Sequence, residues 1–167
     1  MILTTERLTI RLLTPADAPF ILELVNQPSW LRNIGDRNVH SLDEAVGYLE
    51  KGPMASYARH GFGLWCVERT ADRTPVGICG ILKRDYLDDP DIGFAFLERH
   101  QGLGYGKEAA AGTLTYAHEA LGLTGIAAVI DPANAGSIRI VERLGMHYVR
   151  PILMPGDAEE ISFYQEG

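Results

Sequence analysis

The sequence predicts a mixed α/β (α+β) fold in a single domain, residues 1–167, whose central sheet is mostly antiparallel but contains one parallel strand pair. Two observations predict this fold class. Three strand-like runs in the middle of the chain are joined by short polar segments, as antiparallel neighbours are. A strand–loop–helix–strand unit follows, and such a crossover places its two strands parallel. The chain has 167 residues, 46% of them hydrophobic, which suits the core of one domain.

The N-terminal segment predicts a strand followed by a helix. Residues 7–13 (RLTIRLL) alternate between apolar and polar side chains, so they predict a half-buried strand whose buried face continues to Leu12. The TPAD sequence that follows supplies an N-cap threonine and a first-turn proline, which predicts a helix to about Val25. Pro28 is expected to stop this helix, and residues 28–39 are expected to form a loop.

The middle of the chain predicts one short helix and then three strands. Ser41 with Glu44 three residues later is a capping-box pattern, and Gly52 with Pro53 is expected to close the helix that it begins. Gly93 lies inside the third strand and indicates a β-bulge, a feature that often sits beside active sites. The expected strands are 63–69, 75–82 and 91–97.

The second half of the chain predicts two helices and three more strands. Apolar residues from Ala110 to Leu121 recur at spacings of three and four, which is typical of a helix with one buried face. Gly122 suits the position just after the end of that helix. The expected elements that follow are a strand at 125–130, a helix at about 135–144, and closing strands at 147–152 and 160–165.

Composition excludes several classes of protein. The net charge of −7 argues against an extended nucleic-acid surface, and no apolar run is long enough to span a membrane. The N-terminus lacks the pattern of a signal peptide, and Cys66 and Cys79 lie in apolar runs as buried thiols of a reducing compartment would. The five histidines are scattered, so no metal is implied. We therefore expect a cytoplasmic protein, either a monomer or a homodimer.

The glycine-rich segment at residues 100–112 (HQGLGYGKEAAAG) leads into a helix, as phosphate-binding loops do. A P-loop would need a glycine where Gln101 stands, and a serine or threonine after Lys107 where a glutamate stands. A dinucleotide-binding fingerprint matches Gly102 and Gly104 but would need its third glycine at the position of the lysine. Both patterns therefore fail.

A third pattern, Q/R-x-x-G-x-G/A, is satisfied by Gln101, Gly104 and Gly106 and resembles the acyl-CoA-binding signature of the GNAT acetyltransferases. Longer segments resemble the family in the same order along nearly the whole chain. ERLTIRLLTPADAPFI is similar to its opening strand and helix, and DIGFAFLERHQGLGYGKEAA to its strand, loop and helix. GIAAVIDPANAGSIRIVERLGM is similar to the strand, turn and helix that follow. The resemblance is strongest to the RimJ/RimL-like branch, whose characterised members acetylate protein N-terminal amines.

This resemblance implies a GNAT-like fold in which strands 91–97 and 125–130 splay apart to admit acetyl-CoA. The first strand, with its bulge, would pair through its backbone with the pantetheine arm, while the glycine loop holds the pyrophosphate. Asn134 would lie near the pantetheine amides. Arg139 or Arg143 would reach the ribose phosphate, or both would be solvated helix charges. The cofactor-binding residues implied are Ala95, Phe96, Leu97, Gln101, Gly102, Leu103, Gly104, Tyr105, Gly106, Lys107, Asn134 and Ser137.

Acetyl transfer requires a neutral amine and stabilisation of the charge that develops on the thioester oxygen. By the resemblance, Asp91 is the first candidate for the base and Glu98 the second, and the oxyanion would lie near backbone N–H groups of strand 91–97. An aspartate at a strand start also suits a structural role, as a cap of the preceding turn.

The leaving thiolate needs a proton, which many family members supply from a tyrosine in the last helix. Here Val141 occupies that position. Ser137 is then the first choice for the acid, although a serine at a helix start also suits a purely backbone contact. Tyr105 and Tyr148 are further choices.

The acceptor, a peptide or small-molecule amine, is expected to enter over the N-terminal helices. The residues expected to line its site are Trp30, Arg32, Asp36, Tyr57 and Trp65, although a tryptophan such as Trp65 is more often a core residue. The sequence therefore predicts an acetyl-CoA-dependent N-acetyltransferase that acts by direct attack, without a covalent enzyme intermediate. A non-catalytic acyl-CoA-binding module for sensing or assembly is the alternative, and a nucleotide enzyme of the Rossmann or P-loop kind is a third hypothesis.

Overall fold

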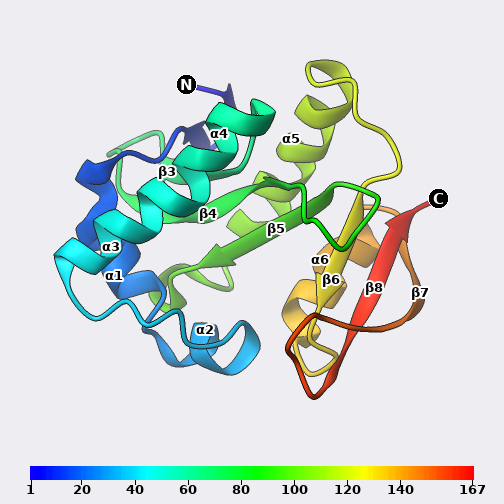
Figure 1. Ribbon diagram of the computed structural model, residues 1–167. Helices are drawn as coiled ribbons and strands as arrows, with labels where there is room; N and C mark the ends of the chain where they lie inside the picture. Colours follow the sequence, from blue (N-terminus) through cyan, green and yellow to red (C-terminus); the bar gives the residue numbers. More distant parts are fainter.

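The computed structural model describes all residues 1–167 and contains one eight-stranded sheet with helices on both faces (Figure 1). The strand order is β1-β2-β3-β4-β5-β6-β8-β7, and only the β5–β6 pair is parallel, so the predicted mixed, mostly antiparallel sheet is confirmed. The strands are β1 (Leu3–Thr4), β2 (Leu8–Arg11), β3 (Leu64–Arg69), β4 (Pro75–Leu82), β5 (Asp91–Phe96), β6 (Ala127–Ile130), β7 (Met146–Leu153) and β8 (Glu160–Glu166).

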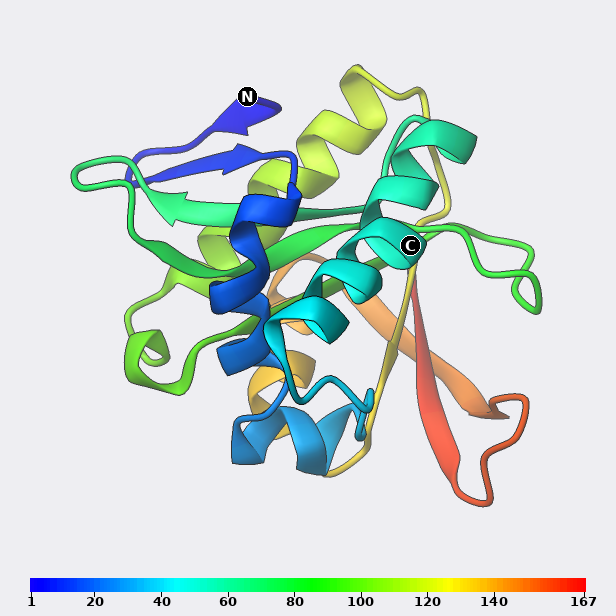
Figure 2. The same cartoon turned by 60° about the vertical axis from the view of Figure 1, so that its left-hand side comes forward.

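The α-helices are α1 (Ala18–Leu24), α2 (Pro28–Asn33), α3 (Leu42–Leu49), α4 (Ala55–His60), α5 (Tyr105–Glu119) and α6 (Ala135–Arg143). Figure 2 shows α1 and α3 on one side of the sheet and α5 on the other. Successive strand residues point to opposite faces, so Cys66 and Ile78 pack under α1 and α3 while Trp65 and Cys79 pack under α5. None of the helices combines the length and the apolarity needed to cross a bilayer.

The strand predicted at residues 7–13 corresponds to β2 and is shorter than predicted. Its alternation holds through Ile10, which is fully buried, and β2 ends at Arg11. The predicted burial of Leu12 is wrong, because this side chain is 45% exposed whereas Leu13 is 2% exposed. The chain leaves the sheet at Arg11, so the period of two no longer decides which side chain points inward.

The prolines of the N-terminal region begin helices as well as ending them. A 3₁₀ turn, η1 (Pro15–Asp17), precedes α1, and the Asp17 carboxylate accepts the Thr14 backbone N–H at 2.9 Å. Pro28 is the first residue of α2, so the expected loop at residues 28–39 contains a helix. Proline suits the first helical position, where its missing N–H has no intrahelical partner to lose.

The helix that begins after Ser41 does not end at Gly52 and Pro53 as predicted. The capping box is present, since the Ser41 hydroxyl accepts the Glu44 N–H at 3.1 Å. After α3, however, the chain continues through a π-helical turn, η2 (Glu50–Met54), directly into α4. The wider π turn accommodates a proline that lacks an N–H, and the segment ends only at Gly61, whose φ is +80°.

Strand β5 pairs one-to-one with β4 over its whole length, so the bulge predicted at Gly93 is wrong. Gly93 lies opposite Gly80, where a Cβ would approach the Gly63 carbonyl oxygen to 2.0 Å. Glycine at position 80 therefore permits close approach of β3 and β4, and no residue of β5 is extra to the ladder.

The sheet divides between β5 and β6. These strands share a single pair of Cα partners, Asp91 with Ala127, and then separate as Figure 1 shows, while β6 continues its pairing with β8. The predicted splay of strands 91–97 and 125–130 is thus confirmed. The gap begins at the amino ends of both strands and widens toward their carboxyl ends, where the glycine loop and the turn before α6 lie.

Candidate functional site

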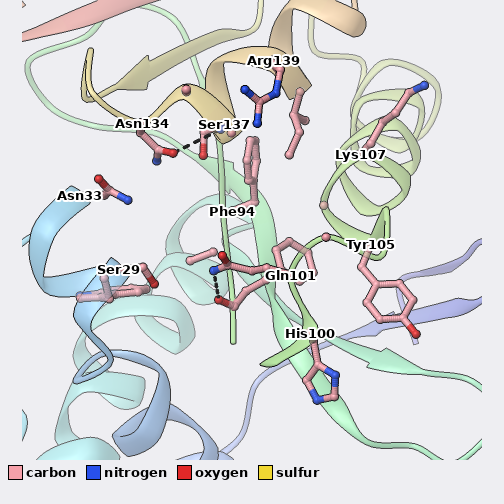
Figure 3. A pocket seen from close by; sticks show the side chains of 18 of the residues that line it. Ser29, Asn33, Phe94, His100, Gln101, Tyr105, Lys107, Asn134, Ser137 and Arg139 are labelled. Carbon is pink, nitrogen blue, oxygen red and sulfur yellow. Dashed lines mark hydrogen bonds between the residues drawn. The ribbon is translucent and has the colours of Figure 1, made fainter. Parts of the chain in front are cut away.

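A cavity of about 570 Å³ fills the space between the separating strands. Its walls come from β5, the glycine loop with the start of α5, the turn and first residues of α6, and α2 (Figure 3). The glycine loop (Gly102 to Lys107) and Asn134, 27 or more residues apart in the sequence, thus face one another across a single cavity. Of the predicted cofactor-binding residues, those that line it are Ala95, Phe96, Gln101, Gly102, Gly104, Tyr105, Gly106, Lys107, Asn134 and Ser137.

The backbone amides of the glycine loop are available to a ligand. None of the six consecutive N–H groups from Gly102 to Lys107 donates a hydrogen bond within the protein. Gly102 and Gly104 have φ values of +78° and +85°, a conformation that favours glycine, and Gly104 is the N-cap of α5. The loop therefore presents free donors at the positive end of a 15-residue helix, which suits an anion.

Gly106 serves this loop through close packing rather than through its backbone conformation. A Cβ at this position would lie 2.9 Å from Cδ1 of Ile140 on α6. The absence of a side chain lets the first turn of α5 approach α6 closely.

The first cavity is positively charged although the chain as a whole carries −7. No aspartate or glutamate lines it, and none of its four lysine and arginine side chains takes part in an ion pair. These four are Arg32, Lys107, Arg139 and Arg143. Four unpaired cations beside free amides fit a ligand with several phosphate groups, as coenzyme A has.

The backbone of β5 offers different residues to the cavity than the sequence suggests. The Leu97 N–H donates to the Val76 carbonyl at 2.9 Å, and hydrogen-bonded pairs alternate along an antiparallel ladder. The backbone groups of Leu97 and Ala95 therefore hydrogen-bond to β4. This corrects their assignment as backbone partners of the pantetheine arm. The backbone groups of Phe94 and Phe96 face the gap instead. Sequence reasoning missed Phe94, because only the register with β4 identifies the open edge.

One of these backbone groups is already occupied. The Phe96 carbonyl accepts hydrogen bonds from Nε2 of Gln27 at 2.8 Å and from Nε2 of Gln101 at 3.0 Å. Gln101 thus ties the glycine loop to the end of β5. The Phe94 N–H and C=O and the Phe96 N–H remain for a ligand.

A second cavity, of about 710 Å³, opens on the other side of the gap, toward α3, α4 and the β7–β8 turn. The two cavities share a common wall. The side chains that line both are Trp30, Asn33, Ile34, Phe94, Ala95, Asn134 and Ser137. A molecule in one cavity can therefore meet a molecule in the other at the middle of β5 and the start of α6.

Asn134 and Ser137 form that shared wall from the α6 side. Oδ1 of Asn134 accepts the Ser137 N–H at 3.3 Å, which caps α6, and the Ser137 hydroxyl has no hydrogen-bond partner (Figure 3). Val141 is fully buried in the core, so no acid stands at its position. Tyr105 lines only the first cavity, under the Arg7 guanidinium at 4.6 Å, and Tyr148 lines neither.

The two carboxylates implied by the resemblance lie outside both cavities. Asp91 is fully buried at the closed end of the gap, where Nε of Arg84 donates to its two oxygens at 3.1 and 3.3 Å. Burial raises the pKa of Asp91 to about 6, opposed by the attraction of Arg84. Glu98 is exposed and accepts the Ser29 N–H at 3.0 Å, near the start of α2. Geometry therefore favours structural roles for both.

A different carboxylate lines the second cavity. Asp131 follows the last residue of β6, and its side chain lies at the cavity wall close to Asn134, whose N–H donates to the Asp131 carbonyl at 2.9 Å. One carboxylate oxygen accepts the Ala133 N–H at 2.8 Å, and the other has no partner. Sequence reasoning missed this residue, although an acidic residue at the end of a splayed strand was a usable signal.

The predicted acceptor residues separate into those at the cavities and those elsewhere. Trp30 lines both cavities, is 4% exposed, and its indole N–H has no hydrogen-bond partner. Arg32 lines only the first cavity. Asp36 is exposed, lines neither cavity, and accepts the Asn38 N–H at 2.8 Å. Of these three, only Trp30 faces the second cavity.

Tyr57 and Trp65 line neither cavity. The Tyr57 hydroxyl accepts the Leu13 N–H at 3.1 Å and donates to the Leu64 carbonyl, and burial raises the pKa of this phenol to about 12. Trp65 is 1% exposed and packs edge-to-face on Tyr116 with ring centroids 5.7 Å apart. Both expectations are corrected for the same reason, which is that these side chains point into packed regions behind β3.

The two cysteines are not placed as nucleophiles. Cys66 and Cys79 are free, fully buried, and line neither cavity. Burial raises the pKa of each thiol to about 12, so both remain protonated and unreactive at neutral pH.

Comparison with known proteins places this architecture in a family. The model of the acetyltransferase (GNAT) domain matches residues 7–147. YkkB of Bacillus subtilis, an uncharacterized protein, is 30% identical over 154 residues, which is 90% of this chain and 87% of that protein. The crystal structure of an acetyltransferase from Agrobacterium tumefaciens is 27% identical, with a TM-score of 0.83 over 99% of this chain and 93% of its own.

The fold is also shared with RimL, a ribosomal alpha-N-protein acetyltransferase solved in complex with coenzyme A. Its TM-score is 0.83 at 16% identity, over 99% of this chain and 96% of its own. The resemblance to the RimJ/RimL-like branch is thereby confirmed at the level of the fold. This chain belongs to the GNAT family of acetyltransferases, whose acyl donor is acetyl-CoA.

Proposed function

We propose that this protein transfers the acetyl group of acetyl-CoA directly to a primary amine, with the donor in the first cavity and the acceptor in the second. The observation that carries the proposal is the wall shared by the two cavities, which includes Phe94, Asn134 and Ser137. Two substrates that enter from opposite sides of the gap meet there. The protonated, buried thiols support direct attack, because neither is available to form an acetyl-enzyme.

The donor is held by the features of the first cavity. The free amides from Gly102 to Lys107 bind the diphosphate, with the N-terminal end of α5 adding its positive potential. Lys107, Arg139 and Arg143 neutralise the remaining phosphate charge. The exposed backbone edge of Phe94 and Phe96 pairs with the pantetheine arm as a neighbouring strand would.

The acceptor amine must lose a proton before it can attack. Asp131 is the carboxylate in the second cavity that lies next to the shared wall, and its unpartnered oxygen binds the ammonium and accepts its proton, directly or through one water. Asp91 does not take this role in our proposal, because its carboxylate is buried against Arg84 and lines neither cavity.

The thioester supplies an activated acetyl group, and transfer forms a C–N bond to the amine and releases the thiol. The Phe94 N–H points into the gap and stabilises negative charge on the acyl oxygen. The Ser137 hydroxyl, unbonded and lining both cavities, donates to the departing sulfur in place of the tyrosine that Val141 replaces.

Binding is tested first, by calorimetry with coenzyme A and with NAD and ATP for comparison. We expect heat only with coenzyme A. The double substitution of Arg139→Gln with Arg143→Gln should weaken its affinity about 100-fold or more, because each lost charge-assisted contact contributes roughly 1.5–3 kcal/mol. Arg59→Gln, an exposed arginine on α4 outside both cavities, is the matched control and should change nothing.

Transfer is tested by thiol release with peptide amines, polyamines and amino acids as acceptors. Turnover with at least one of them is expected, and coenzyme A binding without any turnover would identify a non-catalytic binding module instead. Labelled acetyl-CoA incubated without acceptor should leave no label on the protein, since a trapped acetyl-enzyme contradicts direct attack.

A further inference from the structure

The closed end of the second cavity contains a guanidinium that nothing in the transfer chemistry requires. Arg84 lines this cavity with its side chain 28% exposed. Its Nε donates to both oxygens of Asp91, whose own side chain is 1% exposed, and its Nη1 donates to the Tyr86 hydroxyl at 2.9 Å. Its Nη2 has no partner within the protein. The guanidinium is thus fixed on two sides and unpaired on the third.

This ion pair is a poor device for stability. Burial shifts the pKa of Asp91 upward to about 6 in spite of Arg84, so the loss of hydration outweighs the attraction between the two charges. What the pair does achieve is to hold the planar guanidinium in one orientation at the cavity wall. A preorganised guanidinium with a free donor is the side chain best suited to bind a carboxylate.

The surrounding charge also favours an anion at this end. Lys83 lines the same cavity, and its Nζ is held by the carbonyls of Arg84 at 3.1 Å and Leu87 at 2.6 Å. Asp85, Asp88 and Asp89 of the same loop do not line the cavity. Lys83 and Arg84 against Asp91 therefore leave one net positive charge at the cavity wall. A ligand with no anionic group would leave that charge unmatched.

The opposite end of the cavity carries the opposite charge. Of the aspartate, lysine and arginine side chains that line it, only Arg84 and Asp131 are withdrawn from the surface, whereas Arg37, Lys83 and Asp157 are exposed. Arg84 is held at the level of Asp91, the partner of Ala127, and Asp131 lies four residues further along β6. A strand rises about 3.3 Å per residue, so the two ends are about 13 Å apart.

The floor between the two ends is apolar and open. Leu64, Ile78 and Leu82 line it together with Gly93, where a Cβ would come within 3.3 Å of Cδ1 of Leu82. The glycine that was expected to form a bulge instead leaves room on this floor. The cavity is therefore complementary to an extended molecule with an apolar middle, a cation at one end and an anion at the other.

We infer that the acceptor is a peptide whose terminal amine reaches the shared wall while a carboxylate about four residues away is bound by Arg84. An extended peptide spans about 3.3–3.6 Å per residue, so four residues cover roughly 13 Å, which matches the distance between the charged ends. A free α-amino acid has its amine and carboxylate on the same carbon and cannot reach both. This inference rests on the proposed acetyl transfer and specifies its substrate class.

The test uses the wild-type protein with acetyl-CoA and two matched acceptors, the tetrapeptide Ala-Leu-Leu-Ala as its free acid and as its C-terminal amide. The acid should have a kcat/KM about tenfold higher than that of the amide, mostly through a lower KM. Free alanine should be a poorer acceptor than the acid. Equal kcat/KM for acid and amide overturns the inference while leaving acetyl transfer intact, and no turnover with any amine overturns both.

Variants then locate the anchor. Arg84→Gln should abolish the preference for the acid, and Arg84→Lys should restore only part of it, because an ammonium cannot form the bidentate contact. Arg59→Gln is the control and should preserve the preference. Direct binding of the acid to the protein saturated with coenzyme A provides a readout independent of turnover, and should weaken about tenfold in Arg84→Gln. Unchanged binding in a folded Arg84→Gln protein contradicts the anchor.

Discussion

The two edges of strand β5 differ in what their backbone groups do. Toward β4, six consecutive residue pairs form an uninterrupted ladder, whereas toward β6 only Asp91 and Ala127 are paired. The same strand is therefore a closed structural element on one side and an open binding edge on the other. The cavity therefore exists because β5 leaves backbone groups unpaired toward β6, while its full pairing with β4 holds the strand in the sheet.

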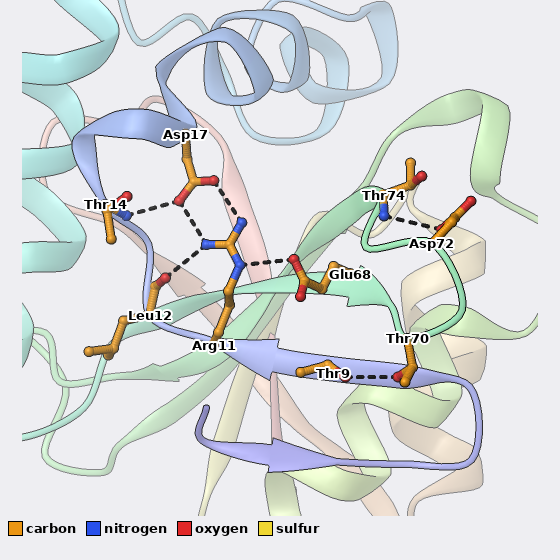
Figure 4. A network of polar contacts seen from close by, with 9 residues as sticks. All are labelled: Thr9, Arg11, Leu12, Thr14, Asp17, Glu68, Thr70, Asp72 and Thr74. Atoms are coloured by element: carbon orange, nitrogen blue, oxygen red, sulfur yellow. Dashed lines mark hydrogen bonds and ion pairs between the residues drawn. The ribbon is translucent and has the colours of Figure 1, made fainter.

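Two arginine clusters repeat this contrast in side chains. On the closed side, Arg11 joins β2 to Asp17 at 2.9 and 3.0 Å and to Glu68 at 2.9 Å, with a further bond to the Leu12 carbonyl (Figure 4). Hydrogen bonding to Asp17 raises the pKa of this guanidinium, whose three nitrogens all have partners. Arg84, at the edge of the gap, keeps one nitrogen free. The Arg11 cluster is a structural staple in which every guanidinium nitrogen is paired, whereas the Arg84 cluster leaves one nitrogen unpaired.

The largest expected effect comes from breaking the closed cluster. Arg11→Met leaves Asp17 and Glu68, which are 7% and 6% exposed, as buried carboxylates without a charged partner, and Asp17 keeps only the Thr14 N–H. The free energy of unfolding should fall by about 3–5 kcal/mol in urea denaturation. Arg69→Met, which breaks an exposed pair with Asp72, should cost less than about 1 kcal/mol. Similar losses in both variants would contradict the staple.

The ion pair of Arg84 and Asp91 should make the free energy of unfolding depend on pH. The pKa of Asp91 is raised to about 6 from an ordinary 3.8, so between these values the folded state binds more protons than the unfolded state. This group's contribution is complete below about pH 4 and is lost as the pH rises through 6, an effect on the order of 3 kcal/mol. Asp91→Asn should remove that slope, and parallel curves for the two proteins would refute it.

Asp131 lines the second cavity, whereas Asp91 and Glu98 line neither cavity. Asp131→Asn should lower kcat about 100-fold, because it removes the proposed proton acceptor, while the affinity for coenzyme A stays unchanged. Asp157→Asn changes an exposed carboxylate on the rim of the same cavity and serves as the matched control. A normal kcat in Asp131→Asn, measured with a saturating acceptor, would return the search for the base to Asp91.

Two glycines with positive φ, Gly104 and Gly122, allow backbone strain to be distinguished from an effect on ligand binding. Gly104→Ala and Gly122→Ala both place a side chain at a positive φ, +85° and +66°, so each should lower the free energy of unfolding by about 1 kcal/mol. Only Gly104→Ala disturbs the amides that face the first cavity, so only this variant should bind coenzyme A more weakly in calorimetry. Equal affinity in the two variants argues against the glycine loop as the phosphate site.

Much of the fold follows from residues close together in the sequence. The capping pattern at Ser41, the strand at 75–82 and the glycine loop ahead of α5 all appear where they were expected. Failures occur where a local signal had two meanings. Pro28 was expected to stop a helix, but α1 ends at Leu24 and Pro28 begins α2. Pro53 was expected to end a helix, but it lies in a π turn that joins α3 to α4.

The amino-acid sequence by itself predicted most elements in their order along the chain, the resemblance to the family and the glycine loop ahead of α5, because periodicity, caps and glycine spacing act over a few neighbouring residues. Only the tertiary structure decided that the backbone groups of Phe94 rather than those of Ala95 face the gap, that Trp65 lies in the core, and that Asp131 rather than Asp91 lines the second cavity. Those outcomes depend on register and burial, which are set by contacts between segments far apart in the chain.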